Sequence, residues 1–264
     1  MRVWHLLVLP LGLCGATPVP PPGPGTDKNG DLLLHNATCP ATGFAFDFAP
    51  TFHVADECHN ENDPNAPFFF NGMYHLFYQD HVLGGVVGGH AASPDLVHWK
   101  RLEVALWNDR WYDDNSVYTF SATIVDDGTP VLVYPGLTDG STTGFCLAQA
   151  VPANLSDPWL QDWVKPDTNP IRCEHEVERD PSTAWRTSWG EWRMTYYHGG
   201  VYASTDFTRW DYVGGLFGNA ECPDFFPLPR ACDGCDDWFH PACVGMTIKQ
   251  AAALKSYVCG QCQL

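Results

Sequence analysis

The fold is decided first by the stretch FFFNGMYHLFY, residues 68–78. Two runs rich in aromatic residues flank the dipeptide Asn71-Gly72. Asparagine and glycine accept the positive φ angles that a tight primed turn requires, so the stretch predicts a β-hairpin. Its two antiparallel strands are expected at residues 68–70 and 74–78.

The same scheme recurs further along the chain. Two more pairs of apolar runs flank turn dipeptides: 124–125 with 131–134 around Asp127-Gly128, and 192–197 with 201–202 around Gly199-Gly200. Between residues 44 and 229 short strands alternate with turns and no long helical periodicity occurs. Regularly spaced antiparallel strands favour a sandwich, a barrel or a propeller. The sequence therefore predicts an all-β fold.

Composition limits the classes of partner. The chain has 264 residues, 45% of them hydrophobic, which is enough for a substantial core. Its 31 Asp and Glu outnumber 14 Lys and Arg, giving a formal net charge of -17. Such a surface repels nucleic-acid phosphates but not neutral sugars, so no nucleic-acid partner is expected.

The N-terminus resembles a secretory signal peptide over residues 1–16. Arg2 precedes the apolar run Leu6–Leu13, and the small residues Gly15 and Ala16 follow. A short anchor or a different start is the alternative. The run is too short to span a bilayer and no later segment is a candidate, so no membrane partner is expected. Residues 17–30 are interpreted as a Pro/Gly-rich linker, and the location as secreted or vacuolar.

Secretion bears on two further features of the chain. Asn36 and Asn154 begin N-x-Ser/Thr motifs and are candidate glycosylation sites. An oxidising compartment also permits disulfides. The candidates are Cys39, Cys58, Cys146 and Cys173, whose pairing the sequence leaves open and which could instead be free core cysteines.

Three separated acidic motifs suggest a site that cleaves glycosidic bonds. They are Asn62-Asp63-Pro64-Asn65, Glu178-Arg179-Asp180-Pro181 and Glu221-Cys222-Pro223-Asp224. Such cleavage uses one carboxylate at the anomeric centre and a second carboxyl group that protonates the leaving oxygen. Asp63, Asp180 and Glu221 are the candidates. The alternative is that an Asp before Pro caps a turn and an exposed Glu is merely solvated.

An ordered series of motifs resembles glycoside hydrolase family 32, the invertase and fructosidase family, and most closely its plant-type acid invertases. The series begins with residues 62–65 and 74–79 and continues through 89–91, 95–99, 111–113, 121–123, 162–165, 179–181, 183–185 and 221–227. The resemblance covers residues 44–229. It implies a five-bladed β-propeller, here apparently truncated, because the family continues well beyond the segment that matches residue 227.

The resemblance also implies roles for individual residues. Asp63 would be the nucleophile, Glu221 the general acid and then base, and Asp180, beside Arg179, would hold sugar hydroxyls in the transition state. Substrate-binding or supporting positions would be Asn62, Gln79, Thr119, Ser121 and Arg179. The implied reaction is hydrolysis of sucrose or a fructan with retention, without a cofactor.

The sequence departs from the family at the sugar pocket. Asn60 stands where the family has Trp, Ala66 replaces the usual Gly, and the loop 80–88 lacks an expected Trp. Tyr118 stands in for a third Trp. Fewer aromatic walls imply weaker stacking on the sugar.

The C-terminal segment, residues 230–264, has a different pattern that resembles the second half of a PHD-type zinc finger. The expected zinc ligands are Cys232, Cys235, His240, Cys243, Cys259 and Cys262, because thiolates and imidazole suit tetrahedral zinc. Cys232, Cys235, Cys259 and Cys262 would form one complete site, and the other two residues half of a second. A disulfide-bonded tail or an unfolded remnant are the alternatives.

The two halves imply different functions. One hypothesis is a secreted fructosidase whose propeller occupies residues 31–229. Another is a zinc-binding module that reads histone tails in the nucleus, attached to an inactive hydrolase remnant; this conflicts with a secretory signal. A third is that two unrelated coding segments are joined near Pro229.

Overall fold

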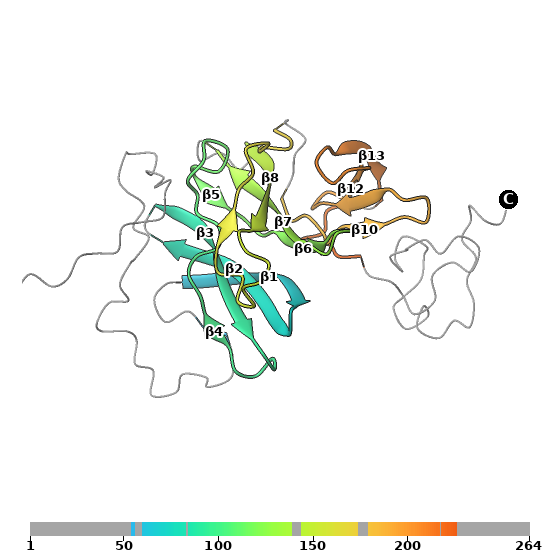
Figure 1. Cartoon of the computed structure of the whole chain (residues 1–264). Coiled ribbons are helices and arrows are strands. Elements are labelled where there is room, and N and C mark those ends of the chain that lie inside the picture. The colour runs from blue at the N-terminus through green and yellow to red at the C-terminus, as the bar shows by residue number, and fades with distance from the viewer. Residues whose placement is uncertain are drawn as a thin grey trace, which may run out of the picture.

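The computed structural model describes residues 54–55, 60–82, 84–138, 144–173, 179–216 and 218–225. Its regular structure in these ranges consists of thirteen β-strands without a helix, which confirms the all-β prediction (Figure 1). No helix long and apolar enough to cross a membrane occurs in this part of the chain. The predicted signal segment, the linker and the zinc ligands lie outside the described residues.

The first four strands form an antiparallel meander. They are β1 (Asn60–Phe70), β2 (Met73–Val82), β3 (Gly85–Ser93) and β4 (Lys100–Arg101). The hairpin predicted at Asn71-Gly72 is confirmed: Phe70 pairs with Met73, and the turn residues have φ angles of 48° and 84°. Local turn chemistry therefore sets the register of β1 and β2.

Two further meanders follow. The second comprises β6 (Ser121–Ile124), β7 (Pro130–Leu137), β8 (Phe145–Pro152) and β9 (Trp163–Val164); the third comprises β10 (Trp185–Arg186), β11 (Trp192–Thr195), β12 (Gly200–Ser204) and β13 (Asp211–Gly215). Both predicted hairpins are confirmed, since Ile124 pairs with Pro130 and Thr195 with Val201. The short strand β5 (Ser116–Val117) pairs with β3 and β7 and joins the first two meanders into one nine-stranded sheet.

The first and third meanders share a turn between their third and fourth strands. In one, the Ser93 hydroxyl accepts the N–H of Leu96 and Asp95 accepts the N–H of His98. In the other, Ser204 and Asp206 accept the N–H groups of Phe207 and Arg209 in the same way. Leu96 and Phe207 also share positive φ angles of 65° and 63°. Repeated four-stranded meanders with equivalent turns are typical of propeller blades.

Two apolar cores hold the meanders together. The first lies between the first two meanders and includes Phe77, Leu106, Val117, Phe120, Leu132 and Tyr134. The second lies between the second and third and includes Val133, Leu147, Trp192, Met194, Tyr202 and Trp210. Figure 1 shows β10–β13 (orange) beside β6 and β7.

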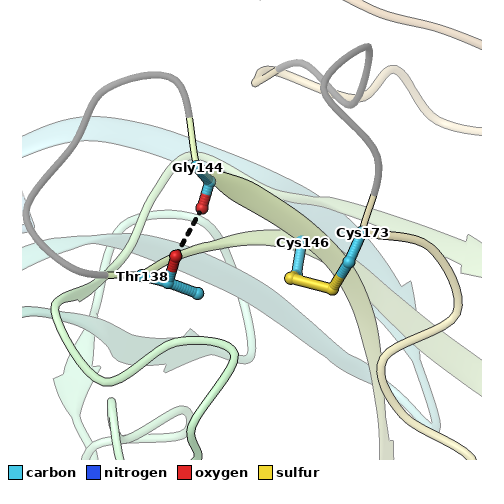
Figure 2. The surroundings of a disulfide bond; sticks show 4 residues. All are labelled: Thr138, Gly144, Cys146 and Cys173. Atoms are coloured by element: carbon cyan, nitrogen blue, oxygen red, sulfur yellow. Dashed lines mark hydrogen bonds between the residues drawn. A yellow bond between two sulfur atoms is a disulfide. The ribbon is translucent and has the colours of Figure 1, made fainter.

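A disulfide links Cys146 on β8 to Cys173, beyond β9 (Figure 2). Gly144, immediately before β8, accepts a hydrogen bond from the Thr138 hydroxyl at 3.1 Å. The sequence left open whether these cysteines are paired or free. The structure shows that Cys146 and Cys173 form a disulfide with each other. Cys39 and Cys58 lie outside the described residues.

Candidate active site

Asp63 lies at a β-bulge in β1. Asn62 pairs with Gln79 and Asn65 with Phe77, so two residues of β1 stand opposite one residue of β2. The φ angle of Asp63 is 46°, a left-handed conformation that is uncommon outside glycine. A bulge bends its strand and changes the direction of a side chain, and such features concentrate at functional sites.

The carboxylate of Asp63 is held by two donors on one oxygen. Oδ2 accepts hydrogen bonds from Gln79 Nε2 at 3.1 Å and from Thr119 Oγ1 at 3.3 Å. Gln79 Nε2 also lies 2.8 Å from Thr119 Oγ1, and Asn62 Nδ2 donates to Gln79 Oε1 at 3.3 Å. The structure therefore brings together four of the residues predicted for the site.

Asp180 is buried at the segment that leads into β10. Its side chain is 3% exposed and its φ angle is 60°. Oδ2 accepts the backbone N–H of Cys222 at 3.3 Å and lies 3.6 Å from Arg179 Nη1. Burial is the main cause that raises the pKa of Asp180; the charges of Glu221 and Asp63 raise it further, while Arg179 and the Cys222 N–H oppose the shift. The three predicted carboxyl groups are thus close enough to influence one another.

Glu221 meets the same group through Arg179. Arg179 Nη2 lies 2.5 Å from Glu221 Oε1, and the guanidinium stacks on the ring of Tyr197 at 4.4 Å. The backbone of Tyr197 donates to Arg179 O at 3.2 Å and accepts from Ala220 N at 2.7 Å. Tyr197 therefore ties the segment carrying Arg179 to the segment carrying Glu221.

A cavity of about 400 Å³ lies at this cluster. It is lined by Asp63, Gln79, His81, Val86, Tyr118, Phe145, Arg179 and Asp180. Asp63 and Asp180 thus share one cavity although 117 positions separate them in the sequence (180 minus 63). Glu221, with 66% of its side chain exposed, is not among the lining residues. The rings of Tyr118 and Phe145 lie 5.8 Å apart on the wall.

A family model for the N-terminal domain of glycosyl hydrolases family 32 matches residues 53–264. The match covers most of the chain. The chain belongs to glycoside hydrolase family 32. The matched range contains every residue of the cavity and extends over the segment predicted as a zinc finger.

Curated relatives agree with this membership. An acid beta-fructofuranosidase from Vicia faba is 40% identical over 215 residues, which is 71% of this chain and 33% of the relative. The vacuolar acid beta-fructofuranosidase 4 of Arabidopsis thaliana is 40% identical over 210 residues, covering 70% and 31%. The chain spans about a third of the length of the curated relatives it matches.

Solved structures show the same fold. Fructan 1-exohydrolase IIa from Cichorium intybus is 36% identical with a TM-score of 0.61, covering 68% of this chain and 37% of that one. A variant of that enzyme in complex with 1-kestose is 34% identical with a TM-score of 0.62, covering 70% and 38%. The described strands therefore correspond to part of a family 32 domain.

Ser121, one of the predicted substrate-binding or supporting residues, is not among the residues that line the cavity. Ser121 is buried on β6 opposite Val133, and its hydroxyl has no hydrogen-bond partner among the described residues. The expected zinc ligands lie outside the described ranges, within which no group of three potential ligands occurs.

His81, Val86 and Phe145 line the cavity but were not predicted from the sequence, although a signal for His81 existed. His81 follows Gln79 by two positions on β2, and residues two apart on a strand share a face. Phe145 and Tyr197 had no comparable signal, because long-range packing brings them to the site.

Proposed function

We propose that the chain is a hydrolase of β-fructofuranosides, acting on sucrose or fructans by a retaining double displacement. The observation that carries the proposal is the shared cavity: Asp63 and Asp180 line it together with Arg179, and Arg179 is paired with Glu221. The mechanism requires a nucleophilic carboxylate and a second carboxyl group that protonates the leaving oxygen, and these roles are assigned to Asp63 and Glu221.

Asp63 is the proposed nucleophile. Gln79 and Thr119 hold Oδ2, so Oδ1 is the oxygen proposed to attack the anomeric carbon of the fructosyl unit. Attack forms a bond from this oxygen to the anomeric carbon while the glycosidic C–O bond breaks. Water then releases fructose, and two inversions give net retention.

Glu221 is the proposed general acid in the first step and general base in the second. Its Oε1 accepts a hydrogen bond from Arg179 Nη2. The role therefore requires Glu221 to part from Arg179 when substrate enters, so that the carboxyl group reaches the leaving oxygen. Arg179 is then available to bind a sugar hydroxyl.

Asp180 is proposed to bind sugar hydroxyls as positive charge develops on the ring. The carboxylate is fixed before substrate arrives by Cys222 N–H and Arg179. Prearranged groups of this kind stabilise a transition state without reorganising during the reaction. The same role extends to Asn62, whereas Ser121 supports the site only indirectly from β6.

The proposed substrate class follows from the relatives. They are named acid beta-fructofuranosidases, and the fructan exohydrolase variant holds 1-kestose. A vacuolar or secreted location is supported by the names of two relatives and by the Cys146–Cys173 disulfide, a bond typical of oxidising compartments.

The domain plan is also a proposal. Residues 31–229 form the hydrolase module, and its three described meanders are assigned to a five-bladed propeller, preceded by the signal (1–16) and linker (17–30) segments. A zinc finger over residues 230–264 is a separate proposal resting on cysteine spacing alone. Metal analysis that finds about one zinc per purified chain would support it, and metal-free protein would reject it.

The hydrolase proposal is tested with the purified chain, sucrose and inulin. Wild type should release fructose, and Asp63→Asn and Glu221→Gln should abolish release. Asp211→Asn, an exposed carboxylate on β13, is the matched control and should leave release unchanged. NMR of the first-formed fructose anomer checks retention. Equal release by wild type and both site variants would reject the assignment.

A further inference from the structure

His81 lies on the cavity wall but has no role in the double displacement described above. Its Nε2 atom forms a hydrogen bond with Oδ1 of Asn62. Asn62 in turn contacts Gln79, and Gln79 contacts Asp63. Four side chains therefore form a continuous hydrogen-bonded series that ends on the proposed nucleophile.

The direction of every bond in this series can be deduced by starting from the Asp63 carboxylate. An ionised carboxylate only accepts hydrogen bonds, so Gln79 must donate through Nε2, at 3.1 Å. Gln79 then presents Oε1 to Asn62, which must donate through Nδ2, at 3.3 Å. Asn62 is left with Oδ1 toward His81, and an amide oxygen cannot donate. His81 must therefore carry a proton on Nε2.

We propose that His81 is a positioning residue that fixes the orientation of the Asn62 and Gln79 amides and, through them, the carboxylate of Asp63. Without a donor at position 81, the amide of Asn62 can exchange its oxygen and nitrogen by rotation. If the Gln79 amide rotated in response, its Oε1 would face the carboxylate of Asp63, and the two oxygens would repel each other. The catalytic part of this inference rests on the proposed function.

His81 is suited to this task because its donor persists in acid. Both the Nε2–H tautomer and the imidazolium carry a proton on Nε2. Protonation of His81 therefore leaves the direction of the series unchanged. A carboxylate at the same position would lack the donor.

Kinetics test the role with paired variants. His81→Leu removes the donor and should lower kcat on sucrose about tenfold, because the nucleophile loses its alignment, with KM within about twofold of wild type. His81→Gln restores a donor and should recover most of the loss. His98→Leu is the matched control: His98 is an exposed histidine bonded to Asp95 at 2.7 Å in the β3–β4 turn, and kcat should stay unchanged. Equal loss in His81→Leu and His81→Gln would overturn the proposal.

A second measurement separates this inference from the proposed function. Long-range ¹H–¹⁵N NMR distinguishes the tautomers of a histidine ring. The signals of His81 are identified as those that disappear from the spectrum of His81→Gln. We expect a single Nε2–H tautomer in wild type and a mixture with Nδ1–H in Asn62→Leu. An Nδ1–H imidazole in wild type would overturn the inference whether or not fructose is released. If the chain is inactive but shows the expected tautomers, the hydrolase assignment is rejected and the inferred orientation of the two amides stands.

Discussion

Arg179 Nη2 lies 2.5 Å from Glu221 Oε1, while Nη1 of the same guanidinium lies 3.6 Å from Asp180 Oδ2. One planar group thus spans two carboxylates from distant segments. The same contacts affect the pKa of Arg179: burial alone lowers it, but the hydrogen bond to Glu221 and the charges of Asp180 and Glu221 raise it overall. Arg179 therefore stays cationic and sets the spacing of the site.

Substitution of Arg179 by Lys tests this geometry. Lysine keeps the charge but cannot present two nitrogens in a fixed plane, so it cannot hold both carboxylates at once. We expect kcat/KM on sucrose to fall about tenfold or more. Arg193→Lys is the control, since Arg193 pairs with Glu191 at 3.0 Å away from the cavity. Equal activity of Arg179→Lys and wild type would contradict the geometric role.

The sequence predicted those features that local chemistry determines. The three hairpins were predictable because Asn71-Gly72, Asp127-Gly128 and Gly199-Gly200 specify tight turns without help from the rest of the chain. The repeated turns at Asp95 and Asp206 were equally local but were not recognised as equivalents. The strands and the register of these hairpins could therefore be predicted from the sequence.

Features that depend on long-range packing could not be predicted from the sequence. The joining of two meanders through β5 and the pairing of Cys146 with Cys173 require the folded chain. At the site, motif order pointed to Asp63, Asp180 and Glu221, but the ion pair between Arg179 and Glu221 connects residues 42 positions apart. No local pattern determines such a contact.

Lys165, directly after β9, forms a buried ion pair with Asp113. Its Nζ lies 2.6 Å from Asp113 Oδ2 and 2.8 Å from Asp109 Oδ1, and its side chain is 7% exposed. Burial raises the pKa of Asp113, and Lys165 opposes that shift. Lys165→Met leaves Asp113 without its cation, so we expect the free energy of unfolding to fall by about 3–5 kcal/mol.

Urea unfolding at neutral pH measures this loss. Lys100→Met is the control, because Lys100 is exposed and lies 4.7 Å over the ring of Trp159. Loss of that contact should cost about 0.5–1 kcal/mol. Equal destabilisation by the two substitutions would show that the buried pair is not special.

The turn at Asp206 predicts acid sensitivity in the third meander. Backbone N–H groups of Thr208 and Arg209 lower the pKa of Asp206 from 3.8 to about 2. Because the folded-state pKa is depressed, the turn is fully stabilised above the unfolded value and loses this stabilisation as pH falls from about 4 toward about 2. Asp206→Ala should therefore lower Tm at pH 6 and differ little from wild type at pH 2. A difference that does not change with pH would contradict the linkage.

Asp180 predicts the opposite dependence, together with a conflict between stability and activity. Burial is the main cause that raises the pKa of Asp180 above 3.8, so ionisation is disfavoured in the folded state. Its charge therefore costs stability at every pH above both the folded and unfolded values, and the cost disappears once pH falls below the unfolded value. Asp180→Asn keeps an oxygen that can accept the Cys222 N–H and removes the buried charge.

We expect this variant to be more stable than wild type at pH 7, to lose that advantage near pH 3, and to release no fructose. Urea unfolding at both pH values, beside Asp211→Asn as an exposed control, measures the effect. A variant that is less stable than wild type at pH 7 would show that the attraction of Arg179 outweighs the burial of Asp180.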